Sequence, residues 1–257
     1  MSGAAIPLLS RRRLLGVSGL ATLGVVAGCA DSAPSSVGEH ETPPASGAKH
    51  APSHEETPPT AHEAWQRLEE GNARFVSGTP LHPHQDAARR IAVAPHQAPY
   101  AFVLGCIDSR VPVETVFDQG VGDLFVGRNA AAILDDTVIG GIEFAVSGYQ
   151  LPLVVIMGHT ACGAVKATVD AVKANPAAPT APGEILDIAQ EILPAVKATA
   201  ENADDNAFVD AVVTTNTRHV ADQLVKRSAM VAEAVKAGTL KIVASTYHLD
   251  TGQIERL

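Results

Sequence analysis

Residues 101–110 read AFVLGCIDSR, and residues 153–162 read LVVIMGHTAC. In each segment a short apolar run, Ala101–Leu104 or Leu153–Met157, is followed closely by side chains that can bind or react. Apolar runs of this kind predict buried parallel strands. Because open α/β sheets bind ligands at the carboxyl ends of their strands, we expect the side chains after the two runs to share one crevice.

Cys106, His159 and Cys162 are the candidate metal ligands of these segments. Two thiolates and an imidazole supply three of the four ligands of a tetrahedral zinc ion and leave one position open. Such ligands favour zinc over harder metals. Asp108 and Arg110 add a carboxylate and a guanidinium beside that position. Two other interpretations stay open on residue chemistry alone: a disulfide between the cysteines, or two inert buried thiols.

Composition sets the class of protein. The chain has 257 residues, with 19 Lys and Arg against 28 Asp and Glu, and 46% of its residues are hydrophobic. This is enough for one ordinary domain with a buried core. An acidic balance with 4% aromatic residues argues against nucleic acid as a partner. The 3 cysteines are too few for a disulfide scaffold.

Residues 1–29 predict an export signal with a lipobox. Residues 10–15, SRRRLL, resemble a twin-arginine signal, and residues 26–29, VAGC, resemble a bacterial lipobox in which Cys29 is lipidated. A plain signal peptide and an uncleaved membrane anchor are the alternatives. Residues 30–60 are rich in Pro, Ser and His and predict a disordered linker. We therefore expect an exported protein, lipid-anchored at the outer face of the cytoplasmic membrane.

Residues 61–257 predict one α/β domain, with Thr60 and Glu63 as a capping box at its start. The hydrophobic pattern and turn residues predict helices at residues 61–77, 85–93, 112–117, 137–146, 164–172, 184–200 and 208–237, and strands at residues 101–104, 122–127, 153–157, 240–246 and 253–257. Strands that alternate with helices and end in a hairpin predict a central, mainly parallel sheet flanked by helices. Four strands are expected to be parallel, with a C-terminal antiparallel strand.

The paired motifs Cys-x-Asp-Ser-Arg and His-x-x-Cys-Gly resemble those of the β-class carbonic anhydrases. The resemblance extends over nearly all of residues 61–257. It includes WQRL at 65–68, GNARF at 71–75, GDLFV at 122–126 with Arg128 and Asn129, IEFAV at 142–146, and Tyr247, Thr251, Gly252 and Leu257 near the C-terminus.

This resemblance implies a metal site and a reaction. Cys106, His159 and Cys162 would bind one Zn²⁺ per subunit, and zinc-bound hydroxide would hydrate CO2 reversibly to bicarbonate and a proton. Asp108 and Arg110 would form the catalytic dyad. In an open state Asp108 accepts a hydrogen bond from the zinc-bound water, and in a closed state it becomes the fourth ligand.

The resemblance also implies a substrate pocket. Gln97 would hydrogen-bond substrate or bicarbonate, Phe125 and Phe144 would line an apolar CO2 pocket, and the N–H of Gly163 would contact Asp108. Core packing explains the two phenylalanines equally well. Phe144 stands where a tyrosine is common in the family.

Two positions depart from the family pattern. Ala132 stands where many relatives have asparagine, and Val103 stands where a bicarbonate-regulated subset has tryptophan, so that regulation is not expected here. We expect a homodimer or a higher even oligomer with active sites at the subunit interface. The alternative functions are hydrolysis of carbonyl sulfide or carbon disulfide on the same fold, and a non-catalytic zinc-binding lipoprotein. The Asp108 and Arg110 pair argues against the second.

Overall fold

The computed structural model describes residues 59–257. The predicted export signal, Cys29 and nearly all of the predicted linker lie outside the described residues. The elements follow in the order α1 (Ala61–Val76), α2 (Ala87–Val93), β1 (Ala101–Cys106), α3 (Val113–Val116), β2 (Leu124–Asn129), the 3-10 turn η1 (Ala130–Ala132), α4 (Asp136–Tyr149), β3 (Leu153–His159), α5 (Gly163–Ala174), α6 (Ile185–Ala198), α7 (Asp205–Arg227), α8 (Ala229–Ala237), β4 (Lys241–Tyr247) and β5 (Ile254–Arg256).

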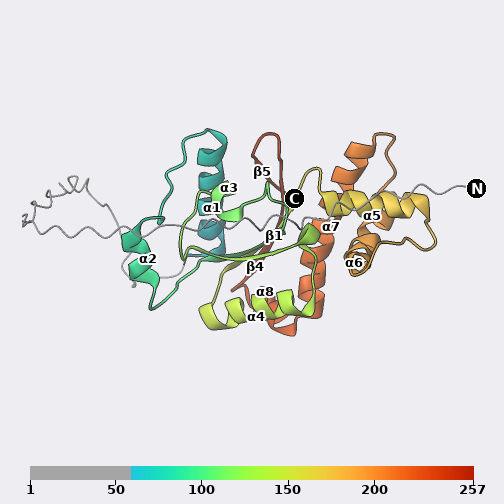
Figure 1. The fold of residues 1–257 in the computed structure, drawn as a ribbon. Coiled ribbons are helices and arrows are strands. Elements are labelled where there is room, and N and C mark those ends of the chain that lie inside the picture. Colours follow the sequence, from blue (N-terminus) through green and yellow to red (C-terminus); the bar gives the residue numbers. More distant parts are fainter. Residues whose placement is uncertain (1–58) are drawn as a thin grey trace, which may run out of the picture. The chain divides into compact units, whose positions relative to one another are not determined.

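The strands form one sheet in the order β2-β1-β3-β4-β5 (Figure 1). The first four are parallel to their neighbours, and β5 pairs antiparallel with β4. Every residue of β1 and β3 is buried, as expected for central strands covered on both faces. The predicted fold class is therefore confirmed: four parallel strands and a C-terminal antiparallel strand, flanked by helices.

Helices cover both faces of this sheet. Figure 1 shows α1 and α3 on one side of the strands and α4 and α8 on the other. Trp65, Leu68 and Phe117 belong to the core of the first side, and Ile142 and Leu224 to that of the second. A third apolar cluster, built mainly by α5, α6 and α7, includes both cysteines of the candidate metal site. The site therefore lies against the part of the core that these three helices form.

The strands that carry the motifs are longer than predicted. β1 continues to Cys106 and β3 to His159, because the parallel ladder extends to the pairs Cys106↔Asn129 and His159↔Tyr247. A cysteine and a histidine are thus the last residues of two adjacent strands. β2 begins at Leu124 instead of Gly122, whose φ of 86° belongs to the preceding turn.

The helix predicted over residues 208–237 is interrupted. Ser228 has an extended backbone, with φ −115° and ψ 109°, and separates α7 from α8. Its hydroxyl accepts a hydrogen bond from the Val231 N–H at 3.1 Å and so caps α8. The capping box of Thr60 and Glu63 is present as predicted. No helix within residues 59–257 is both long and apolar enough to span a membrane.

Candidate metal centre

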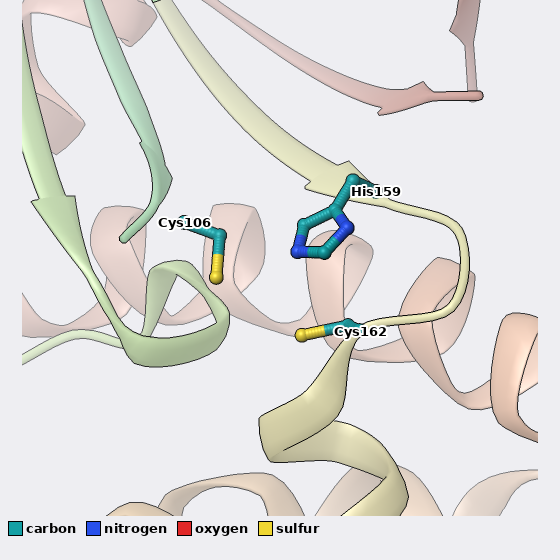
Figure 2. A group of neighbouring side chains, drawn as sticks. All are labelled: Cys106, His159 and Cys162. Carbon is teal, nitrogen blue, oxygen red and sulfur yellow. The ribbon is translucent and has the colours of Figure 1, made fainter. Parts of the chain in front are cut away.

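Cys106, His159 and Cys162 converge on one point (Figure 2). Cys106 ends β1, His159 ends β3, and Cys162 is the residue before α5. One ligand atom from each lies within 4.8 Å of the other two. The three residues are only 4%, 1% and 2% exposed, and both cysteines are free thiols. The structure thus shows neither a disulfide nor scattered core thiols, but a cluster with the donors that a zinc ion prefers.

His159 is oriented as a metal ligand. Its Nδ1 lies 2.9 Å from the carbonyl oxygen of Thr160, so Nδ1 carries the proton and donates it there. The lone pair is then on Nε2, which is buried and has no hydrogen-bond partner among the described residues. A buried polar atom without a partner calls for an explanation. A metal ion supplies one, because ligating histidines are commonly held by this kind of bond at the other nitrogen.

The thiols have different proton affinities in the metal-free chain. A hydrogen bond from the Cys162 thiol is the main cause that lowers the pKa of Cys106 to about 4, against the opposing effect of burial. The N–H groups of Asp108 and Ala131 also donate to Cys106 Sγ, each at 3.4 Å. The pKa of Cys162 is raised, because its thiol proton is held by Cys106 and because it is buried. A cation that binds here would displace the thiol protons, because thiolates and not thiols bind metal ions.

The Asp108 carboxylate is held by Arg110 beside these ligands. Asp108 Oδ1 accepts from the backbone N–H and the Nε of Arg110, both at 2.9 Å, and Oδ2 accepts from Nη2 at 2.7 Å. These hydrogen bonds lower the pKa of Asp108 well below its usual range, so the group is an anion and an acceptor. Oδ2 lies 3.9 Å from His159 Nε2. A fixed acceptor therefore lies next to the ligand atom of His159.

Three of the residues predicted for the substrate pocket, Gln97, Phe125 and Phe144, lie together at a distance from the metal ligands. Gln97 Nε2 donates to the Tyr149 hydroxyl at 2.9 Å, and the ring centroids of Phe125, Phe144 and Tyr149 are 5.0–6.5 Å apart. Phe125 pairs with Phe102 in the β1–β2 register. At about 3.3 Å per residue this places it ~13 Å along the strand from the level of Cys106. We call Gln97, Phe125, Phe144 and Tyr149 the aromatic cluster.

A small cavity of about 10 Å³ borders the metal ligands. It is lined by Cys106, Ala131, Gly158, His159, Cys162, Val165, Val213, Asn216 and Thr217, and by no member of the aromatic cluster. Gly163 begins α5 and is exposed. Within residues 59–257 the Asp108 carboxylate accepts hydrogen bonds from Arg110 alone. The predicted Gly163–Asp108 contact stays a prediction.

Sequence reasoning missed three residues that support the site. Arg128 donates from Nε to the Cys106 carbonyl and from Nη2 to the Asp108 carbonyl, both at 2.7 Å. Asp210 and Asn216, both on α7, contact Ala161 in the loop that carries Cys162 and Ala131 in the turn beside Cys106. The sequence could have indicated Arg128, because it lies near the end of a predicted strand that pairs with β1. No local pattern marks Asp210 or Asn216, because their partners lie 49 and 85 residues away in the chain.

Comparisons with known proteins agree with this geometry. A family model described as "Carbonic anhydrase" matches residues 101–254. A Mycolicibacterium smegmatis protein named carbonic anhydrase is 42% identical over 192 residues, which are 75% of this chain and 91% of that protein.

Solved structures show the same fold. The Coccomyxa β-carbonic anhydrase in complex with acetazolamide matches with a TM-score of 0.60 and 23% identity over 73% of this chain and 83% of that one. A structure from a study of two tetrameric β-carbonic anhydrases of Sordaria macrospora matches with a TM-score of 0.57 and 22% identity, over 76% and 97% of the two chains. The chain therefore belongs to the carbonic anhydrase family, and its fold is that of the β class.

Proposed function

We propose that this protein is a zinc enzyme that hydrates CO2 reversibly to bicarbonate and a proton. The observation that carries the proposal is the buried cluster of two thiols and one unpartnered imidazole nitrogen, with the Asp108–Arg110 pair beside it. A zinc ion held by these three ligands would lower the pKa of a water at its open position toward neutrality and so supply the nucleophile.

The chain's own residues have distinct parts in this reaction. Cys106 and Cys162 bind as thiolates, and His159 binds through Nε2. Asp108 accepts a hydrogen bond from the attacking water and so aims its lone pair at the carbon of CO2. Arg110 fixes that carboxylate with two parallel bonds, a geometry that lysine cannot reproduce. A protein that only stores zinc has no need of an oriented carboxylate, so the dyad favours catalysis.

The aromatic cluster supports assembly of two or more copies. Phe144 is 59% exposed although it is a large apolar side chain, and Figure 1 shows its helix, α4, on an outer face of the sheet. A cluster that lies ~13 Å along the strand cannot line the metal site of its own chain directly. We infer a homodimer or higher even oligomer in which the aromatic cluster of one copy lines the apolar CO2 pocket beside the metal ligands of another copy.

Light scattering during gel filtration tests the assembly. The wild-type protein is expected to elute as an even oligomer, and Phe144→Asp is expected to shift it toward the monomer, because a carboxylate cannot be buried unpaired in an apolar contact. A wild-type protein that is monomeric at micromolar concentration contradicts the inference.

We also propose that the chain is exported and anchored by a lipid on Cys29, on the strength of the arginine run and the lipobox pattern alone. In cells labelled with a radioactive fatty acid, the wild-type protein should carry label in the membrane fraction. Cys29→Ala should lose both label and membrane association. A Cys29→Ala protein that stays membrane-bound refutes the lipid anchor.

Stopped-flow CO2 hydration on purified protein of measured zinc content tests the activity. We expect a rate well above buffer for the wild type and a large loss for Asp108→Asn with zinc still bound. Cys162→Ser should lose zinc and activity together. A zinc-loaded wild type with no rate above buffer overturns the proposed function.

A further inference from the structure

Two loops beside the metal-ligating cysteines hold alanines in the left-handed region: the turn η1 after β2, which contacts Cys106, and the loop between β3 and α5, which carries Cys162. Ala131 has φ 58° and ψ 20°, its neighbour Ala132 has φ 53°, and Ala161 has φ 53°. This region is costly for a residue with a Cβ and is normally occupied by glycine or asparagine. Such conformations persist only where the surrounding structure enforces them, and they are concentrated at functional sites.

Two of these alanines, Ala131 and Ala161, contact the metal site directly. The N–H of Ala131 donates to Cys106 Sγ at 3.4 Å. Ala161 immediately precedes Cys162, and its carbonyl oxygen lies 3.5 Å from Nη2 of Arg110 as an acceptor. The Ala131 backbone thus donates a hydrogen bond to the Cys106 sulfur. The Ala161 backbone leads directly into Cys162 and accepts a hydrogen bond from Arg110 of the dyad.

The same helix holds both alanines. Asn216 Nδ2 of α7 donates to the Ala131 carbonyl at 3.2 Å, and Asp210 Oδ1 of α7 accepts from the Ala161 N–H at 2.7 Å. Asn216 is only 2% exposed. Among the described residues these are the only side-chain hydrogen bonds that either α7 residue makes. α7 is itself fixed by Val220 and Leu224 in the core against the sheet.

We propose that Asp210 and Asn216 are positioning residues that hold Ala161 and Ala131 in their left-handed conformations and so aim Cys162 and Cys106 at the metal. The inference rests on the metal centre of the proposed function. A hydrogen bond that a carboxylate accepts from a backbone N–H is strong, and an uncharged amide suits the buried contact at Ala131. α7 thereby acts as a rigid support that fixes the positions of two loops, one after β2 and one after β3, relative to each other.

Zinc affinity, measured by competition with a chromophoric chelator, tests the proposal. Asn216→Ala and Asp210→Ala should each bind zinc about 10–100-fold more weakly, the usual effect of losing a group that orients a ligand. Asp210→Asn keeps an oxygen that can accept from the Ala161 N–H and should recover most of the affinity. Thr215→Ala is the matched control, because within residues 59–257 the Thr215 hydroxyl bonds only to the Ala211 carbonyl and to Thr199, the residue after α6.

A double variant separates positioning from general stability. Glycine reaches positive φ freely, so Ala131→Gly should remove the need for Asn216. Asn216→Ala should then cost about tenfold less affinity in the Ala131→Gly background than alone. The cobalt(II) form supplies a readout besides affinity and activity: its thiolate charge-transfer and d–d bands should change in Asn216→Ala and return in the double variant.

The outcomes are distinct. Equal losses in both backgrounds, or zinc affinities and cobalt spectra like those of the wild type, overturn the proposal. If Asn216→Ala does not fold, the Asp210→Ala and Asp210→Asn pair decides by the same measurements, and equal zinc affinities in those two variants overturn it. A wild-type protein that binds no zinc overturns the metal centre itself, whereas zinc-binding wild type with unaffected variants overturns only the role of α7.

Discussion

Replacing Gly158 by alanine tests how closely α7 lies against the end of β3. Gly158 is buried and directly precedes His159. A Cβ at this position would lie 2.3 Å from Thr217 Oγ1 and 2.9 Å from Val213 Cγ1, both on α7. Real Cβ atoms do not approach other atoms this closely, so the helix or its side chains must move.

The cost follows from these contacts. Forcing an extra methyl into a well-packed interior typically costs about 1–3 kcal/mol. Thr217 Oγ1 also donates to the Val213 carbonyl at 2.8 Å, and turning the side chain away forfeits this bond, worth about 1 kcal/mol. We therefore expect Gly158→Ala to lower the free energy of unfolding of the metal-free protein by roughly 2–4 kcal/mol.

Gly163→Ala is the matched control. Gly163 flanks Cys162 as Gly158 flanks His159, yet its Cβ would meet no atom within 4 Å. Since alanine is also the better helix former, Gly163→Ala should leave stability equal or raise it by up to about 1 kcal/mol. Urea denaturation followed by circular dichroism measures both variants.

A second variant makes the test sharper. Thr217→Ala removes the nearest obstacle, so in that background Gly158→Ala should cost at least about 1 kcal/mol less than alone. If Gly158→Ala costs no more than Gly163→Ala, the close approach of α7 to β3 is wrong. In that case α7 does not lie close enough to β3 to support the metal site.

Three further outcomes are expected. CO2 hydration should rise from pH 6 to pH 9, because two thiolates neutralise the charge of the ion and leave the bound water less acidic than at a three-histidine site; a flat stopped-flow rate over this range contradicts it. Burial opposes ionisation of Asp118, but hydrogen bonds from Arg74 and two backbone N–H groups outweigh it and lower its pKa in the folded state. Because the folded pKa of Asp118 lies below the unfolded value of about 3.9, this stabilisation is present above that pH and is lost as the pH falls below it. The urea midpoint of Asp118→Asn should therefore depend less on pH between about pH 3 and 5 than that of the wild type. Asn72 is buried and joins three elements by bonds to the Val116 and Gly252 carbonyls and from the Ile254 N–H, so Asn72→Ala should cost about 2–4 kcal/mol in a thermal melt; a loss below ~1 kcal/mol contradicts these bonds.

The strands and the ligands could be predicted from the sequence because both depend on local patterns. Apolar runs before Cys106 and His159 predicted central parallel strands, and parallel strands bring their carboxyl ends to the same edge. The break between α7 and α8 at Ser228 could have been predicted, because serine is a preferred N-cap residue. The apolar pattern continues across Ser228, however, and so indicated one helix.

The support of the site could not be predicted in this way. Asn216 and Asp210 resemble ordinary polar residues of a helix, and only the folded chain shows that they contact Ala131 and Ala161. Gln97, Phe125 and Phe144 of the aromatic cluster were named through family resemblance, whereas Tyr149 was not. The distance of the cluster from Cys106 depends on the β1–β2 register, which no single segment encodes.

The left-handed alanines also restrict which amino acids the turn after β2 and the loop after β3 can accept. Glycine, asparagine and aspartate adopt positive φ at little cost, whereas a β-branched side chain does not. The exposed position 161 can therefore exchange alanine for any of these residues, whereas the buried position 131 accepts glycine but not an unpaired polar or charged side chain. Valine, isoleucine and threonine are excluded there, although none of them would compete for the metal. Sequence drift in these loops is thus limited by a backbone angle and not by the chemistry of the reaction.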